Sequence, residues 1–171
     1  MKPAKKTKGA KGRRPLTREW LLPLPPAHVR DISLKCHMAL VALRGDHGHE
    51  ELLLRLRTSV YLVFASLADI RSHAASLELC LEAERVLDAC AERAANGDAW
   101  ALRDDECAAL EQLLTAHDAC VETLSRSRLA DLWRHVCAFA QSGIQAPLAL
   151  AVAKMRERET STMHGMAAVA A

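Results

Sequence analysis

Aromatic residues, glycine and long apolar runs are all scarce in this chain of 171 residues. Only 4% of the residues are aromatic, and only seven are glycine. A membrane-spanning helix needs a run of about 18 or more apolar residues with few or no charges. The apolar stretch from Leu52 to Ile70 comes nearest, but Arg55, Arg57 and Asp69 interrupt it. The sequence therefore predicts no membrane contact.

Motifs that carry common catalytic or phosphate-binding chemistry are also missing. The chain has no Gly-x-Ser-x-Gly elbow, no glycine-rich phosphate loop and no Gly-x-Gly-x-x-Gly fingerprint. His49 and Glu50 begin like a zincin motif, but position 53, where the second histidine would stand, is leucine. No histidine follows a glutamate by three residues, as the di-iron bundles require. We therefore expect a protein that is not an enzyme and that holds no cofactor.

Six cysteines and eight histidines raise the question of a metal site. No CxxC pair occurs, and the cysteine spacings match no structural zinc motif. His117 and Cys120 are three residues apart and would share a helix face, so a role for them beyond packing stays open. Cys120 lies at the edge of a predicted core stripe, and the others lie on such stripes, as small hydrophobic residues do: Cys36, Cys80, Cys90, Cys107 and Cys137. We expect no metal, and free cysteines in a reducing cytoplasm.

The formal net charge of +2 hides a strong separation of charge along the chain. Residues 1–18 contain eight basic residues and no acidic residue, whereas residues 19–171 contain 15 basic and 21 acidic residues, a net charge of −6. Glycine and proline interrupt this basic start, which predicts a disordered arm over residues 1–19. Its basic residues are Lys2, Lys5, Lys6, Lys8, Lys11, Arg13, Arg14 and Arg18.

These eight residues are the candidate nucleic-acid contacts, because flexible lysines and arginines bind phosphates without reading base sequence. A solubilising tail would have the same composition. Residues 69–122 hold 13 acidic and four basic residues, so this part of the body would repel nucleic acid. Weak, nonspecific contact is therefore expected at the arm and not at the body as a whole.

Apolar residues recur at spacings of three and four along most of the chain, which is the period of an α-helix. The pattern predicts an all-α bundle of four or five helices over residues 20–142, with an extended segment from Trp20 to Pro26. An Ala-rich segment, partly helical and then disordered, is expected over residues 143–171. The second helix is apolar around most of its circumference and is expected at the centre. The helices are expected at about residues 26–44, 49–71, 75–95, 104–124 and 128–140.

Three short motifs carry a resemblance: Leu24–Arg30, Tyr61–Phe64 and Trp100–Glu106, together with His117-Asp118. They resemble small, uncharacterised helical proteins of proteobacteria, some of which carry the label of Fis-type transcriptional regulator. The resemblance implies a bacterial helical protein with a link to transcription. A Fis-type unit ends in a polar recognition helix, but residues 147–153 are apolar, so no functional residue is carried over.

Two functions remain open from the sequence. The first is a non-catalytic accessory or regulatory protein, linked to transcription, that contacts nucleic acid weakly through its arm. The second is a protein–protein interaction module or a structural homo-oligomer, for example a homodimer that buries the helix at 128–140 and the Ala-rich segment.

Overall fold

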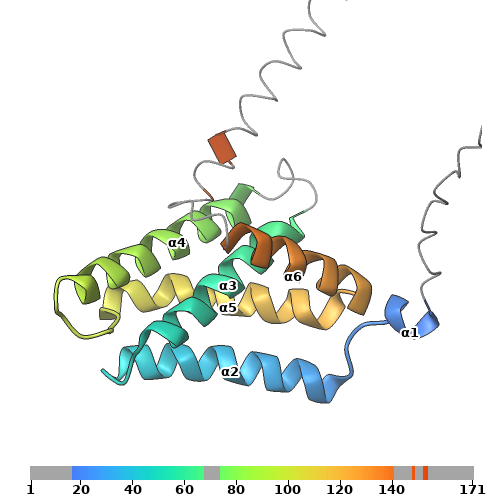
Figure 1. The fold of residues 1–171 in the computed structure, drawn as a ribbon, viewed down its shortest axis with the longest axis horizontal. Coiled ribbons are helices and arrows are strands. Elements are labelled where there is room, and N and C mark those ends of the chain that lie inside the picture. The colour runs from blue at the N-terminus through green and yellow to red at the C-terminus, as the bar shows by residue number, and fades with distance from the viewer. Residues whose placement is uncertain (1–16, 68–73, 141–147, 149–151, 154–171) are drawn as a thin grey trace, which may run out of the picture.

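The computed structural model describes residues 17–67, 74–140, 148 and 152–153. This part of the chain forms six helices and no β-strand, which confirms the all-α class (Figure 1). None of its helices has the length and apolar character needed to cross a membrane. The helices are α1 (Arg18–Leu21), α2 (Pro26–Arg44), α3 (Glu50–Ser66), α4 (Ala74–Ala95), α5 (Asp104–Thr123) and α6 (Arg126–Ala140).

The boundary between the predicted arm and the helical part of the chain differs from the prediction. Arg18, expected in the arm over residues 1–19, begins α1, and Trp20, expected in an extended segment, lies in this single helical turn. The Trp20 N–H donates to the Thr17 carbonyl at 3.0 Å, and the Leu22 carbonyl accepts the Arg126 N–H at 2.9 Å. These bonds satisfy backbone groups locally and fix the segment against the start of α6. The other seven basic residues of the predicted arm lie outside the described residues.

The structure also bears on the end of the second predicted helix and on part of the Ala-rich segment. The second predicted helix, expected to reach residue 71, ends at Ser66, because Leu67 has a non-helical backbone with ψ at 88°. Of the Ala-rich segment, Leu148 and Val152 are buried and helical, and the Leu148 N–H donates to a carboxylate oxygen of Glu84 at 3.4 Å. Most of residues 143–171 lies outside the described residues.

The central position predicted for the second helix is confirmed. α3 runs obliquely between α2 on one side and α4 and α6 on the other, and it also packs against α5 (Figure 1). Contacts on several sides explain why its apolar residues extend around most of the helix. The buried residues of α3 are Leu53, Leu56, Ser59, Val60, Tyr61, Leu62 and Val63.

A bidentate ion pair joins the end of α4 to the start of α5. The Arg93 guanidinium donates to both carboxylate oxygens of Glu106, at 2.8 and 2.7 Å, and both side chains are mostly buried. Glu106 also accepts the Arg103 backbone N–H at 2.9 Å, which caps the helix. Two-point pairing of this kind fixes the relative orientation of the two helices.

Four of the six cysteines are buried as predicted, and Cys120 is half-buried, as expected at an edge. The expectation for Cys137 is wrong, because this residue is only half-buried near the end of α6. At this point of α6 the neighbouring Val136 is the residue that packs into the main core.

Gly48 marks a close crossing of two chain segments. A Cβ atom built on Gly48 would lie 1.8 Å from the Trp100 carbonyl oxygen and 2.6 Å from a methyl carbon of Leu43. The Leu102 N–H donates to the Leu43 carbonyl at 3.0 Å, so backbone bonding holds the loop between α4 and α5 against this point. Only glycine fits here without displacing the backbone.

We expect Gly48→Ala to lower the free energy of unfolding by about 1–3 kcal/mol, because overpacking forces the backbone to shift. Gly45→Ala is the matched control, since its added Cβ would approach no atom closer than 3.4 Å. Urea denaturation of both variants measures the difference. An equal effect at the two positions would contradict the close crossing.

Candidate functional site

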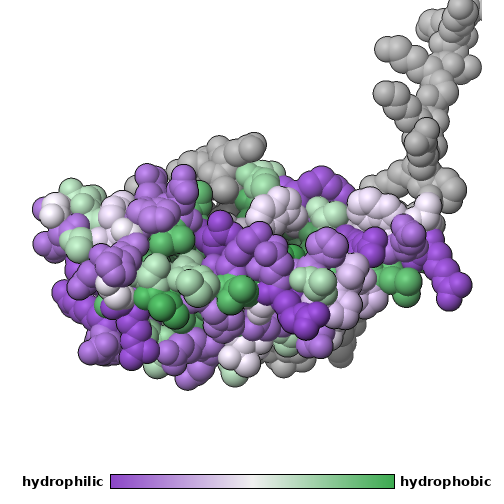
Figure 2. Space-filling model, turned by 90° about the horizontal axis from the view of Figure 1, so that it is seen from below, coloured by the Kyte–Doolittle hydropathy of each residue, from purple (hydrophilic) through white to green (hydrophobic). Residues whose placement is uncertain are grey.

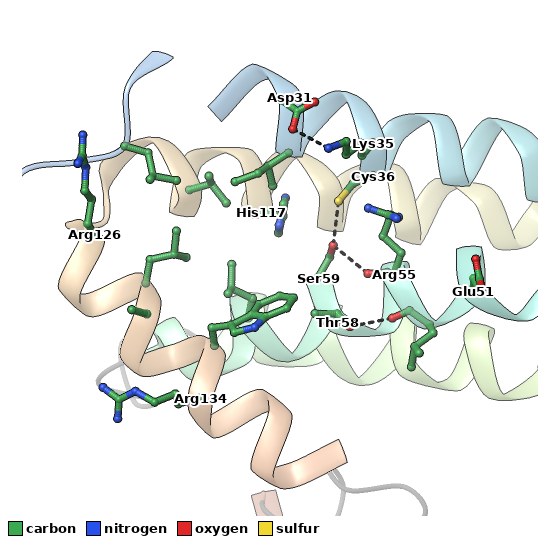
Figure 3. A pocket seen from close by; sticks show the side chains of 18 of the residues that line it. Asp31, Lys35, Cys36, Glu51, Arg55, Thr58, Ser59, His117, Arg126 and Arg134 are labelled. Atoms are coloured by element: carbon green, nitrogen blue, oxygen red, sulfur yellow. Dashed lines mark hydrogen bonds and ion pairs between the residues drawn. The ribbon is translucent and has the colours of Figure 1, made fainter. Parts of the chain in front are cut away.

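A groove of about 1150 Å³ lies between α2, α3 and α6, with α5 behind it (Figure 3). Three helices each turn one face toward it. On α3 this face includes Leu54, Thr58 and Leu62, which recur every four residues. The other lining residues are Trp20, Leu24, Asp31, Ile32, Lys35, Cys36, Glu51, Arg55, Ser59, His117, Val121, Arg126, Leu129, Ala130, Trp133 and Arg134.

The groove is closed at the end where α2 and α6 both begin. Pro23 and Ser125 form an isolated antiparallel bridge there, and the Leu22 carbonyl accepts the Arg126 N–H. From this point α2 and α6 run apart, each packed against α3 (Figure 1). The surface of α3 between them therefore stays uncovered.

Part of a second, smaller hydrophobic cluster forms the floor of the groove. Leu62 of α3 and Val121 of α5 are buried in this cluster and line the groove, whereas Leu132 of α6 is buried in the cluster without lining the groove. Leu24, Ile32 and Leu129 pack against these residues but are only partly buried. The floor therefore offers apolar surface that a ligand could still cover.

Three large hydrophobic side chains stand at the edge of the groove and remain half exposed. Trp20 is 47% exposed, Leu54 is 54% exposed and Trp133 is 52% exposed. Trp133 is exposed although it lies on the same helix as the buried Leu132 and Val136. Exposed aromatic residues gathered around an apolar floor are typical of interaction sites.

The charged residues of the groove are mostly basic. Lys35 pairs with Asp31, and Arg134 pairs with Asp131 on its own helix. Neither Arg55 nor Arg126 has an ion-pair partner within the described part of the chain, and Arg126 Nε is buried with no hydrogen-bond partner there. An anionic group entering the groove would supply what these guanidinium groups lack.

Cys36 lies at the inner wall, with its Sγ 3.4 Å from Ser59 Oγ. Burial raises the pKa of this thiol, so Cys36 is protonated at neutral pH and is a weak nucleophile. Cys120 lies apart, with its Sγ 3.2 Å from Ser66 Oγ. Within the described residues no group of three or more histidine, cysteine or carboxylate side chains could hold a metal ion.

Asp118 joins α5 to α2 beside the groove, and sequence reasoning did not find this link. Its carboxylate accepts the Ser33 hydroxyl, lies 2.9 Å from His37 Nε2, and lies 3.5 Å from His117 Nδ1. Burial acts to raise the pKa of Asp118, but these hydrogen bonds outweigh it and hold the pKa below its ordinary value. Ser33 and His37 are one turn apart on α2, and this spacing is the only feature of the sequence that points to a shared partner.

His117 is 4% exposed on the groove wall. Burial lowers its pKa below the ordinary 6.5, and the neighbouring Asp118 only partly opposes this effect. The imidazole is therefore neutral at pH 7, with the Asp118 carboxylate as its neighbour. His117 and Cys120 contact different partners, so the structure does not join them in one site.

Among the predicted nucleic-acid contacts, the structure places only Arg18, which is exposed on α1. No protein-family model, curated protein or solved structure matches this chain. The resemblance to Fis-type proteins therefore stays a prediction.

We expect the free energy of unfolding to fall as the pH drops below 6.5. The reason is that the unfolded chain binds a proton at His117 before the folded chain does. An NMR titration should give an imidazole midpoint below 6.5 for His117. His117→Gln should flatten the pH dependence; a variant whose stability falls with pH as steeply as that of the natural chain would contradict the assignment.

Proposed function

We propose that this chain is a non-catalytic interaction protein that binds an amphipathic helix of a partner protein in the groove. The observation that carries the proposal is the ring of half-exposed Trp20, Leu54 and Trp133 around an apolar floor. Tryptophan is the side chain most often found at the energetic centre of protein interfaces. The mixture of apolar floor and charged edge also matches the usual anatomy of such interfaces.

The dimensions of the groove favour a helix over a small molecule. Its volume of about 1150 Å³ exceeds the roughly 1000 Å³ at the upper end of small-molecule pockets. Its lining runs along α3 from Glu51 to Leu62, which at 1.5 Å per residue is about 16 Å, or three helical turns. Anchors at positions i, i+4 and i+7 of a docked helix span about two turns, so the groove is long enough to receive all three.

The charge of the groove favours an acidic partner. Arg55 and Arg126 come from α3 and α6 and have no ion-pair partner within the described residues. A carboxylate on the docked helix would meet Arg126 at the closed end (Figure 3). Charge pairs of this kind give specificity and faster association more than they give affinity.

A synthetic three-turn peptide with leucine at positions i, i+4 and i+7 and glutamate at its flanks tests the proposal. In the Trp100→Phe variant both remaining tryptophans line the groove, so we expect the peptide to change their fluorescence. Adding Trp133→Ala should weaken peptide binding at least tenfold, with Trp20 as the remaining reporter.

The matched control is Leu21→Ala, which removes an exposed apolar side chain outside the groove lining and should leave peptide affinity unchanged. A peptide with lysine in place of glutamate should bind more weakly. If the acidic peptide leaves the fluorescence unchanged at every concentration, the groove does not receive a helix.

Nucleic-acid binding by the basic arm is the second candidate function, and the separation of charge along the chain favours it. Residues 1–18 contain eight basic residues and no acidic residue, and Arg18 is exposed on α1. Contact with phosphates would be weak and nonspecific, and a role in transcription would follow only from such contact. All six cysteines are free, which supports the related proposal of a reducing, cytoplasmic location.

Replacing the seven basic residues before Thr17 by glutamine in the full chain tests the arm and leaves α1 intact. We expect affinity for duplex DNA to fall, and the slope of log affinity against log salt to shrink by about 0.9 for each lost phosphate contact. Fluorescence anisotropy across a salt series measures both quantities. An unchanged slope would show that the arm does not contact DNA.

A further inference from the structure

A short apolar segment projects at one end of the molecule, where α1 leads into α2. Trp20, Leu21 and Leu22 follow one another in sequence and are 47%, 58% and 51% exposed. α1 lies beyond the first turns of α2 and α6 (Figure 1), and the bond from the Arg126 N–H to the Leu22 carbonyl holds it there. Figure 2 shows hydrophobic atoms beside strongly hydrophilic ones at this end of the molecule. We call Trp20, Leu21 and Leu22 the α1 tip.

Basic residues accompany the α1 tip. Residues 1–16 lie outside the described residues, and their sequence contains seven basic residues and no acidic residue. Arg18 and Arg128 are exposed at the starts of α1 and α6. Glu19 and Glu122 are exposed acidic residues at the same end, and they offset only a small part of this positive charge. An apolar tip and a large positive charge therefore come from one short stretch of the chain.

We propose that the α1 tip and the basic residues before it bind the surface of a membrane that contains anionic phospholipids. The three apolar side chains enter the boundary between headgroups and acyl chains, where tryptophan is enriched. The lysines and arginines stay among the anionic headgroups. Stable attachment to a bilayer takes two signals, and a small apolar anchor next to a polybasic segment supplies both.

A lipid surface accounts for the apolar and the basic residues together. A nucleic acid would attract the basic residues, but contacts to its phosphates would leave Leu21 and Leu22 in water. A protein interface would cover the leucines, but lysine is depleted in such interfaces, and five of the seven basic residues before Thr17 are lysine. An anionic bilayer covers the leucines and neutralises the lysines in one contact.

This inference goes beyond the proposed function and does not depend on it. Leu21 and Leu22 do not line the groove, and Trp20 is the one residue of the α1 tip that does. The sequence prediction of no membrane contact rested on the lack of a spanning segment. Attachment at the surface of a bilayer needs no such segment.

Trp20 can report the contact directly. The Trp100→Phe/Trp133→Phe variant keeps Trp20 as its only tryptophan. We expect vesicles of phosphatidylglycerol and phosphatidylcholine in equal parts to shift its emission to shorter wavelength and to protect it from acrylamide, because the indole leaves water. Vesicles of phosphatidylcholine alone should leave the emission unchanged, since they lack the net negative charge that attracts the basic residues.

Two sets of substitutions separate the apolar from the electrostatic contribution. In vesicle sedimentation, Leu21→Ser/Leu22→Ser should lower affinity for the anionic vesicles at least about tenfold. Replacing the seven basic residues before Thr17 by glutamine should lower it to a similar degree. The matched control is Met38→Ser/Val41→Ser, which removes two exposed apolar side chains toward the other end of α2 and should leave affinity unchanged. Circular dichroism checks that each variant is folded.

Duplex DNA distinguishes a lipid surface from a nucleic acid as the partner of the basic residues. Leu21→Ser/Leu22→Ser should weaken binding to anionic vesicles and leave affinity for DNA unchanged. If this variant binds the vesicles as tightly as the natural chain, the contact is electrostatic only and the inference is overturned. It is also overturned if the natural chain binds DNA and the anionic vesicles leave the Trp20 emission unchanged, or if neither partner binds.

Discussion

The burial of α3 among its neighbours is the constraint on which the rest of the structure depends. Four helices pack against it, and aliphatic residues such as Leu56, Val60 and Val63 are removed almost completely from water. Each such side chain contributes about 1.5–3 kcal/mol relative to an exposed position. Because α2, α4, α5 and α6 all pack against α3, the face of α3 that they leave open becomes part of the lining of the groove.

The groove persists because its closed end is fixed by backbone bonds. The pairing of Pro23 with Ser125, and of Leu22 with Arg126, holds the starts of α2 and α6 together. The two helices then follow different faces of α3, so they cannot close over Leu54 and Trp133. Leaving large apolar side chains in water forgoes the free energy of their burial, and a folded monomer recovers it only when something covers them.

Periodicity predicted the five long helices and the central position of α3, because repeated apolar spacing reports directly which face of a helix is buried. Periodicity could not predict that Trp133 is half exposed. The spacing of apolar residues identifies the apolar face of a helix, but it does not show whether another helix covers that face. The short α1 depends on a contact between Leu22 and Arg126, which are distant in sequence. The Asp118 link between α5 and α2 likewise depends on how the helices meet. The groove arises from such long-range contacts, so sequence reasoning missed it.

The positions of α1 and the groove relate the two candidate functions to each other. Trp20 lines the groove, and Arg18, two residues before it in the same helical turn, continues from the basic N-terminal residues. A helix docked against Trp20 would contact the same helical turn that holds Arg18. Arg55 and Arg126, which have no ion-pair partner within the described residues, would favour an acidic group over a basic one in the groove. The two proposed functions would therefore take different partners, an acidic helix in the groove and a nucleic acid at the basic N-terminal residues, and α1 is the element that both proposals share.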